Sequence, residues 1–459
     1  MSTPEAINKQ VSMEELVSLA KRRGFVFQAS EIYGGLAGFY DWGPYGSEML
    51  KNIKDAWWNA MVYGHTNIVG VNTAIIQNPK LWEASGHTAT FADPMIDCKS
   101  CKHRFRADHV AGLDTNSLEK LDAALADKSC PNCGKKGTFT PARNFNMMFK
   151  TYVGPAEDTA NVAYLRPETA GGIFTEFANV RETSRQKLPF GIAQIGKAFR
   201  NEITPKDFVF RLRELEQMEM EYFVYPKDAP EAYEYWKKFC MEFLQELGLT
   251  KENLRLRDHA EDEKAHYAAA SVDVEYNYPF GGFKELWGIA NRTDYDLSAH
   301  MKASGKDLTY FDEPTGERIT PYVIEPAIGA DRLFLALFSD AYTEEEVNGE
   351  TRVVMKFTPQ IAPVKVAVLP LSKKPELSEV AKQVWKSLSG TMKVEYDETQ
   401  SIGKRYRRQD EIGTPLCVTV DFDTLEDKAV TVRHRDTMEQ ERIKIDELPT
   451  YIASKLAKF

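Results

Sequence analysis

The chain has 459 residues, of which 43% are hydrophobic, 27% are charged and 11% are aromatic. This composition excludes an intrinsically disordered chain, and the length suggests about three domains. The formal net charge of −10 argues against a general nucleic-acid coat protein, which would carry a large excess of Lys and Arg. It does not exclude an enzyme that contacts RNA through local basic patches.

No apolar run approaches the roughly 20 residues needed to span a bilayer. The first residues also lack the basic region and apolar segment of a secretory signal. We therefore expect a cytoplasmic protein with no membrane partner.

The N-terminal part of the chain predicts two helices and a strand. Residues 13–23 begin with a capping box and are followed by Gly24, which can end a helix. Pro44 can start a longer helix, whose apolar residues recur at helical spacing until Gly64. The segment 65–77 is rich in Ile, Val and Thr and predicts one strand.

Residues 97–145 differ in character and are predicted to be an insertion into the main domain. They contain two Cys-x-x-Cys pairs, Cys98 with Cys101 and Cys130 with Cys133, and a short helical pattern between the pairs. Four thiolates at this spacing suit a closed, structural zinc site. Disulfides are not expected in a reducing compartment, so the alternative is four reduced thiols without a metal.

The segment from about 150 to 340 predicts an α+β domain built on one large sheet. Helices are expected at 229–247 and after Gly329. Strands are expected at 192–200, 213–225, 271–278, 284–291 and 321–326.

The C-terminal part predicts a linker followed by a compact α/β module. Residues 341–363 contain acidic and Pro-rich stretches and are expected to connect the two parts. The module, 364–459, is predicted to contain strands at 364–370, 393–397, 416–421 and 429–433 and helices at 376–389 and 446–457.

Two charged segments lie within otherwise apolar elements. In the strand near 213–225, alternation places Arg211, Arg213, Leu215, Gln217 and Glu219 on one face. Such a face is costly unless it lines a polar cavity, and the alternative is a solvated face of an edge strand. These residues are therefore candidates for a binding site.

An arginine also lies in the first turn of the helix that follows Gly329. The helix dipole disfavours Arg332 there, so a negative or aromatic group should lie against it. The alternative is a simple pairing with Asp331. A third charged segment, 166–172, is expected to form a tight turn at a strand end.

These segments together resemble the class II aminoacyl-tRNA synthetases. FRNE followed by RLRELEQME is similar to motif 2, GADR is similar to motif 3, and the helix from Pro44 through QNPKLWEASGH is similar to motif 1, the dimer element. With RPETA, ELWGIANRTDYDL and EPAIGADR in this order, the chain is similar to the glycyl-tRNA synthetases from about Phe25 to its C-terminus.

The resemblance implies an antiparallel-sheet catalytic domain at 1–340, a zinc-ribbon-like insertion at 97–145 and a C-terminal α/β anticodon-binding domain at 364–459. It implies a homodimer that ligates glycine to tRNA(Gly) through a glycyl-adenylate, with ATP, Mg²⁺ and a structural Zn²⁺. A catalytically inactive synthetase-like accessory subunit and another class II synthetase are alternatives. The retained motif arginines and carboxylates favour the glycine enzyme.

The resemblance also assigns residues to the nucleotide. Arg200 is implied at the α-phosphate, Glu202 at the adenine end and Arg211 at the terminal phosphate. Arg332 is implied on the adenine ring and phosphate, and Glu285 at the ATP-bound Mg²⁺. The implied catalytic residues are Arg200, Glu202 and Arg332, and the implied ATP site also includes Asn201, Phe210, Leu215, Leu286 and Gly329.

On the amino-acid side, three carboxylates are implied around the ammonium of glycine: Glu168, Glu219 and Glu325. The implied substrate contacts also include Arg106, Leu215, Gln217, Ala327 and Gly329. The chain departs from the family at two positions, where Leu215 replaces a common Phe and Ala327 a common Ser, which leaves their effect on affinity open.

The C-terminal module carries local positive charge in an otherwise acidic chain. The clusters are GKRYRRQDEIGTP, which starts at Gly403, and Arg433-His434-Arg435. We expect them to contact the RNA backbone, and the alternative is ordinary solvated charge.

Overall fold

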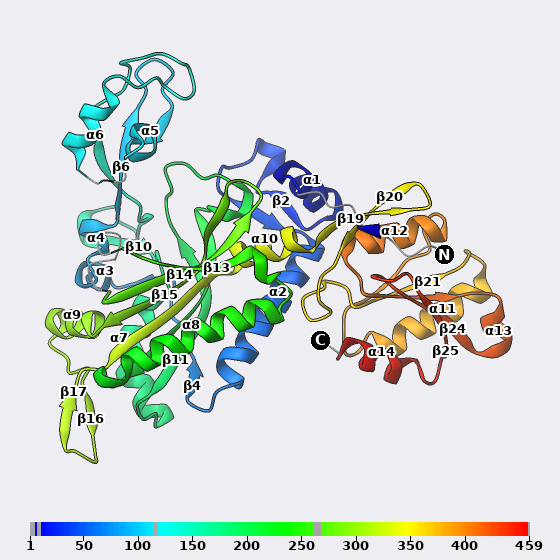
Figure 1. Cartoon of the computed structure of the whole chain (residues 1–459). Coiled ribbons are helices and arrows are strands. Elements are labelled where there is room, and N and C mark those ends of the chain that lie inside the picture. Colours follow the sequence, from blue (N-terminus) through cyan, green and yellow to red (C-terminus); the bar gives the residue numbers. More distant parts are fainter. Residues whose placement is uncertain (1–4, 7–10, 114, 116, 261–267, 458–459) are drawn as a thin grey trace.

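The computed structural model describes residues 5–6, 11–113, 115, 117–260 and 268–457. The ends of the predicted catalytic and anticodon-binding regions therefore lie outside the described residues. Figure 1 shows a central body around a large sheet, a small insertion that projects from it, and a C-terminal module beside it.

The N-terminal segment packs into the main core through its helices. Its elements are β1 (Glu5–Ala6), α1 (Met13–Arg23), β2 (Val26–Gln28), η1 (Glu31–Tyr33), β3 (Tyr40–Trp42), α2 (Pro44–Trp58) and the π-helical η2 (Asn59–Tyr63). Helix α1 confirms its prediction, because the Glu15 amide donates to Ser12 Oγ and Gly24 ends the helix with a φ of +75°. The second predicted helix is also confirmed, since the helical chain runs from Pro44 to Gly64.

A seven-stranded sheet forms the centre of the molecule. In spatial order its strands are β13 (Leu254–Asp258), β14 (Ala270–Tyr278), β15 (Gly282–Thr293), β18 (Tyr322–Gly329), β12 (Glu214–Val224), β11 (Phe190–Phe199) and β4 (Ile68–Gly70). Neighbours are antiparallel except for β11 and β4. This sheet contains the strands predicted between 192 and 326, and the α+β prediction is confirmed.

The prediction of one strand at 65–77 is wrong. The chain leaves the large sheet after β4 and enters another sheet at β5 (Ile76–Gln77), which pairs with β10 (Val162–Leu165). Between the two strands, the Thr73 amide donates to Gln194 Oε1 at 2.7 Å and its carbonyl accepts from Arg166 Nη1 at 2.9 Å. Side chains thus satisfy backbone groups that a continuous strand would pair in a ladder.

Helices cover both faces of the large sheet. The helices α8 (Ala229–Glu246) and α10 (Ala330–Ala341) confirm the two predicted ones and join α2 in the largest core cluster. On the opposite face, α7 (Ala170–Ser184) and α9 (Tyr295–Ser304) enclose a second core. Shorter elements connect these parts: η4 (Phe208–Phe210), η5 (Pro226–Asp228), η6 (Lys251–Asn253), β16 (Tyr310–Asp312) and β17 (Glu317–Ile319).

Helices α7 and α9 were not predicted. Helix α7 begins with Ala170-Gly171-Gly172, and two glycines in the first turn weaken the helical signal. Packing explains one of them, because a Cβ at Gly172 would overlap Thr73 Oγ1. The turn predicted at 166–172 is thus a turn followed directly by a helix.

The insertion is a small unit with its own core. Its elements are β6 (Ala92–Asp97), β7 (Arg104–Arg106), α5 (Ala107–Ala111), α6 (Leu118–Leu125) and β8 (Arg143–Asn146), with strand order β7-β6-β8. Ile96, Ala107, Leu121 and Leu125 are buried together, and α6 confirms the predicted short helix. The flanking elements are α3 (Pro79–Ala84), α4 (His87–Thr90), β9 (Lys150–Tyr152) and η3 (Thr159–Asn161).

The segment predicted as a linker, 341–363, contains a β-hairpin that was not predicted. Strands β19 (Tyr342–Val347) and β20 (Glu350–Met355) pair with each other, and β19 also pairs with β1. The C-terminal sheet follows in the order β22 (Val394–Tyr396), β21 (Val366–Pro370), β23 (Leu416–Val420), β24 (Ala429–His434) and β25 (Gln440–Lys444). Its helices are α11 (Pro375–Leu388), α12 (Ile402–Ile412), α13 (Asp423–Asp427) and α14 (Leu448–Leu456).

This module contains the predicted strands and helices, but α12, α13 and β25 were not predicted. Helix α12 joins the module to the hairpin through buried charge. Arg352 of β20 is fully buried and donates to Glu345 at 2.5 Å, to Asp410 of α12 at 2.8 Å and to the Arg435 carbonyl at 2.5 Å. Arg433 donates to the same aspartate at 2.9 Å.

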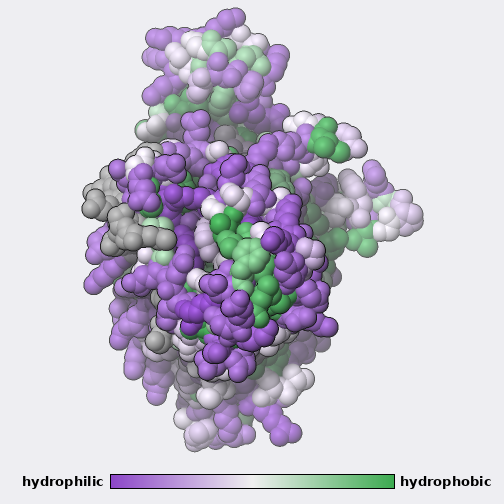
Figure 2. All heavy atoms as spheres, turned by 90° about the vertical axis from the view of Figure 1, so that its right-hand side faces the viewer, coloured by the Kyte–Doolittle hydropathy of each residue, from purple (hydrophilic) through white to green (hydrophobic). Residues whose placement is uncertain are grey.

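Two further observations concern the outside of the molecule. Figure 2 looks onto the side of the C-terminal module and shows a largely hydrophilic surface with an apolar strip near its centre. Within the part of the chain that the structure describes, no helix has both the length and the apolar character required to cross a membrane.

Candidate active site

The predicted site residues gather in one pocket on the central strands of the large sheet. The pocket encloses about 230 Å³. Because β12 lies between β18 and β11, the alternative of a solvated edge strand is wrong. The predicted residues that line the pocket are Glu168, Arg200, Glu202, Phe210, Arg211, Leu215, Gln217, Glu219, Glu285, Leu286, Glu325, Ala327, Gly329 and Arg332.

At one end of the pocket, Arg332 lies against both an aromatic ring and a carboxylate. Its guanidinium carbon is 4.5 Å from the Phe210 ring centroid, and Nη1 is 3.1 Å from the Glu285 carboxylate. This ion pair lowers the pKa of Glu285. The alternative pairing with Asp331 is wrong, because that carboxylate accepts the Glu216 amide at 2.8 Å. The guanidinium is therefore held at the pocket wall between the Phe210 ring and the Glu285 carboxylate.

Two more arginines lie at the same end. The Nε of Arg200 donates to the Pro167 carbonyl at 3.0 Å, and Arg211 Nη1 is 3.7 Å from Glu202 Oε2. Among the described residues, Arg211 Nε and Glu202 Oε2 are buried without a hydrogen-bond partner. An unsatisfied buried polar group costs about 1–3 kcal/mol, so this end is built to bind a polar ligand.

The opposite end is strongly acidic. Carboxylate oxygens of Glu219, Glu221 and Glu325 lie within 4.8 Å of one another, and Glu168 also lines the pocket. Burial, followed by the charges of Glu325 and Glu168, raises the pKa of Glu219 to about 8. Burial likewise raises the pKa values of Glu221 and Glu325. A cation bound beside these carboxylates favours their ionised form. The cluster is therefore suited to bind a cation.

Positive groups balance part of this charge. Arg292 of β15 donates to Glu325 Oε2 at 2.6 Å and forms two bonds with Asp296, at 2.8 and 2.9 Å. His87 Nε2 lies 3.3 Å from Glu168 Oε2. Although burial opposes ionisation, His87, Arg292 and Arg200 lower the pKa of Glu168 to about 2. These neighbours therefore favour the ionised form of Glu168.

Sequence reasoning missed several of these residues: His87, Glu221, Arg292 and Asp296. A signal was present for two of them, because Arg292 and Asp296 are four residues apart within the quoted segment ELWGIANRTDYDL.

Two predicted residues lie outside the pocket wall. Arg106, at the end of β7, donates to Asp93 at 2.8 Å and to Asp108 at 2.6 Å and is not among the lining residues. Asn201 follows Arg200, and its amide donates to the Met147 carbonyl at 2.7 Å. Both lie near the site, and neither faces the space that the pocket encloses.

The two departures from the family both line the pocket. Leu215 presents an aliphatic side chain where an aromatic face is common in the family, and Ala327 presents a methyl group where a hydroxyl is common. The adenine end therefore has the Phe210 ring and the Arg332 guanidinium as its planar groups.

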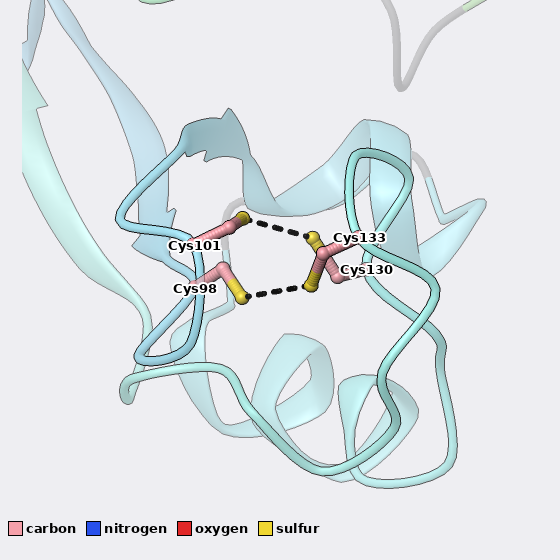
Figure 3. A group of neighbouring side chains, drawn as sticks. All are labelled: Cys98, Cys101, Cys130 and Cys133. Carbon is pink, nitrogen blue, oxygen red and sulfur yellow. Dashed lines mark hydrogen bonds between the residues drawn. The ribbon is translucent and has the colours of Figure 1, made fainter.

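The four predicted metal ligands meet in the insertion. Figure 3 shows Cys98 and Cys101 facing Cys130 and Cys133 across a small gap. The sulfur atoms are 3.8 Å apart for Cys98 and Cys133 and 3.7 Å apart for Cys101 and Cys130. Tetrahedral zinc with Zn–S bonds of about 2.3 Å requires sulfur separations of about 3.8 Å. The cluster fits zinc.

The structure buries three arginines of the predicted basic RNA-contact clusters, whereas Lys404 of the first cluster is exposed. Arg405, Arg433 and Arg435 are buried, with exposed fractions of 1%, 5% and 4%. Arg405 donates to the carbonyls of Pro370, Asp397 and Leu371, and Arg435 to that of Gly413. Sequence clustering cannot distinguish such internal bonding from a surface patch.

Comparisons with known proteins agree with this architecture. The family model described as "tRNA synthetase class II core domain (G, H, P, S and T)" matches residues 150–341, and "Anticodon binding domain" matches residues 365–455. The glycine–tRNA ligase of Clostridium acetobutylicum is 56% identical over 97% of this chain and 99% of its own length. The glycine–tRNA ligase of Geobacillus kaustophilus is 54% identical, over 97% and 99%.

A solved structure shows the same fold at low identity. It is prolyl-tRNA synthetase from Cryptosporidium parvum complexed with halofuginone and AMPPNP, with a TM-score of 0.65 and 16% identity over 98% of this chain and 79% of that one. At this identity the likeness supports the fold of the core and C-terminal module.

Proposed function

This chain belongs to the glycine–tRNA ligase family, and on that premise we propose how its pocket joins glycine to tRNA(Gly). The protein is an ATP-dependent ligase with a class II synthetase core and an anticodon-binding domain. One observation carries the assignment of the pocket, namely its division into an arginine-rich end and a carboxylate-rich end.

The arginine-rich end suits the nucleotide. Arg200 and Arg211 would contact phosphate oxygens, which guanidinium groups bind with charge-assisted hydrogen bonds. Arg332, which lies over the Phe210 ring, would contact the adenine ring, and the unsatisfied carboxylate oxygen of Glu202 would accept a hydrogen bond from the adenine amino group. These contacts would orient the α-phosphate toward the acidic end.

The acidic end suits the ammonium of glycine. Glu168, Glu219 and Glu325 approach the pocket from three elements, so a small cation there can be bound on several sides. The carboxylate of glycine would then attack the α-phosphorus of ATP, a new C–O–P linkage would form, and pyrophosphate would leave. Fixed guanidinium groups stabilise the negative charge that builds up in this step.

In the second step, a ribose hydroxyl at the 3′ end of tRNA(Gly) attacks the glycyl carbonyl, and AMP leaves. The new bond is an ester between glycine and the ribose. The acidic end keeps the ammonium of glycine in place during both steps, so the same residues orient the amino acid for activation and for transfer.

Two metal ions fit this scheme. Mg²⁺ prefers carboxylate and phosphate oxygens, and the half-exposed Glu285 carboxylate at the pocket offers such an oxygen to ATP-bound Mg²⁺. Cys98, Cys101, Cys130 and Cys133 would hold a structural Zn²⁺, which stabilises the insertion.

We further propose the assembly and location of the enzyme. The motif 1 segment carries exposed apolar residues, Ile75 and Ile76, beside a groove, and this surface fits a homodimer contact. The domains would be a core at 1–340 with its insertion at 97–145, a connection at 341–363 and an anticodon-binding domain at 364–459. Because the reaction serves protein synthesis, the enzyme should act in the cytoplasm.

An exchange assay tests the assignment. The protein should incorporate pyrophosphate into ATP with glycine and with none of the other nineteen amino acids, and it should charge tRNA(Gly) in total tRNA. Arg200→Ala and Arg332→Ala should each lose the exchange, because both remove charge stabilisation at the phosphates. Retained exchange in both variants contradicts the placement of the site, and no exchange in the unchanged protein indicates a catalytically inactive relative.

A further inference from the structure

The loop between β2 and β3 exposes an unusual group of apolar side chains. Ile32 and Tyr33 of η1 are each 87% exposed, and Leu36 is 55% exposed. Large apolar side chains grouped in this way on a surface mark an interaction site more often than isolated ones do. We call Ile32, Tyr33 and Leu36 the η1 surface.

The loop that carries the η1 surface is held by hydrogen bonds. Gln28 Nε2 donates to the Leu36 carbonyl at 2.8 Å and to the Phe39 carbonyl at 2.9 Å, while the Tyr33 amide donates to the Ser30 carbonyl at 2.9 Å. Gly35 has a φ of +76°, and a Cβ there would meet Gln28 Cγ at 2.7 Å. The backbone is thus fixed while the apolar side chains point outward, so little conformational entropy is lost when a partner binds.

The same loop packs against the segment that forms the pocket wall. Arg213 donates through Nη1 to the Ala37 carbonyl at 2.9 Å and through Nη2 to the Glu202 carbonyl at 2.8 Å. Gly38 approaches this segment so closely that a Cβ would meet Pro205 Cβ at 2.8 Å. One arginine therefore links the loop to Glu202, which lines the pocket.

The position of the loop indicates which partner the η1 surface binds. In Figure 1 the α1–β2 region lies between the large sheet and the C-terminal module. A tRNA that reaches both the pocket and the C-terminal module must bring its unpaired 3′ nucleotides to the pocket from outside. Exposed aromatic side chains bind single-stranded nucleotides by stacking, whatever the base.

We propose that the η1 surface is a stacking platform for the single-stranded 3′ end of tRNA. This proposal rests on the proposed function and names a surface that guides that substrate into the pocket. Tyr33 supplies the aromatic face, Ile32 and Leu36 flank it, and Arg213 fixes the loop relative to Glu202. The surface acts in tRNA binding and has no part in adenylate formation.

The test compares Tyr33→Ala with Tyr33→Phe, which keeps the ring. A matched control is Phe311→Ala, because Phe311 of β16 is a 47% exposed aromatic residue at another end of the molecule (Figure 1). Each protein is assayed for glycine-dependent exchange, for kcat/KM in charging tRNA(Gly), and for Kd with intact tRNA and with tRNA that lacks its single-stranded 3′ nucleotides.

Tyr33→Ala should lower kcat/KM and weaken binding of intact tRNA by about 5- to 140-fold, the range of one base–aromatic stack. Glycine-dependent exchange by Tyr33→Ala should be unchanged. Tyr33→Phe and Phe311→Ala should resemble the unchanged protein in every assay. The shortened tRNA should bind Tyr33→Ala as well as it binds the unchanged protein.

Three results overturn the proposal: unchanged charging by Tyr33→Ala, an equal loss of affinity for the shortened tRNA, or a change in oligomeric mass, which would assign the surface to a second copy of the chain. Absence of exchange in the unchanged protein would instead refute the proposed function.

Discussion

Glycine binding should depend on pH through Glu219. The structure places its carboxyl in the buried acidic end, where Glu221, Glu325 and Glu168 lie around it, Thr169 donates to it, and the charges of Arg292 and Arg166 act on it. Its pKa of about 8 means that it is mainly protonated at neutral pH before glycine binds. An ammonium favours the ionised form, so binding should release a proton.

The direction and the size of the change in glycine affinity with pH follow from this proton release. Below pH 8, proton loss from Glu219 opposes glycine binding, so affinity should rise as pH rises and level off above the pKa. With a free-state pKa of about 8 and a carboxylate that stays ionised at pH 6 when glycine is bound, the glycine KM at pH 6 should be about 50 times that at pH 8. This ratio corresponds to about 2.3 kcal/mol.

The assay is glycine-dependent exchange at saturating ATP between pH 6 and 8, with KM and kcat measured separately. Glu219→Gln is the control, because an amide keeps the shape and cannot ionise. Its KM should be higher at pH 8 and nearly independent of pH. A flat KM profile in the unchanged protein refutes the reasoning, and a persisting slope in Glu219→Gln assigns the titration to another carboxyl.

Three further changes test other parts of the structure. Leu215→Phe should lower the KM for ATP about 2- to 12-fold in exchange assays, because it adds an aromatic face worth about 0.5–1.5 kcal/mol; an unchanged KM would contradict the placement of adenine beside this residue. Metal analysis should find one zinc per chain in the unchanged protein and none in Cys98→Ser, which should also have a lower melting temperature, and a full zinc content in this variant would contradict the four-cysteine site. Gly172→Ala should lower the free energy of unfolding by about 1–3 kcal/mol in urea titrations, because its Cβ would overlap Thr73 Oγ1, whereas Gly403→Ala, with nothing within 4 Å among the described residues, should be neutral or stabilising.

The pocket was largely predictable because its residues occur in short contiguous segments. In a strand, alternation alone places Leu215, Gln217 and Glu219 on one face, and all three line the pocket. The position of Arg332 at a helix start predicted an aromatic or negative neighbour, and Phe210 and Glu285 are those neighbours.

Contacts that depend on strand register were not predictable. Arg292 reaches Glu325 because β15 and β18 pair with Ala290 opposite Glu325, a register that sequence periodicity does not contain. Similarly, the hairpin β19–β20 exists partly because β19 pairs with β1 from the far end of the chain. Long-range pairings of this kind explain the wrong strand at 65–77 and the hairpin that was not predicted within 341–363.

Burial of charged side chains explains the other main difference between prediction and structure, which concerns the basic clusters of the C-terminal module. The arginines of α12 and β24 form a basic cluster in the sequence, and an exposed patch and an internal network look alike at that level. Asp410 lies in α12 and pairs with Arg352 and Arg433. These pairings show that the arginines belong to an internal network.

The buried Arg352 also affects how the core and the C-terminal module unfold. Arg352 belongs to the hairpin, yet its partners include Asp410 and the Arg435 carbonyl of the C-terminal module. Separating the two parts would break these buried hydrogen bonds of the Arg352 guanidinium, and a hydrogen bond to a charged group contributes about 1.5–3 kcal/mol. Core and module should therefore melt in a single calorimetric transition, and a protease should not release the module as an intact fragment.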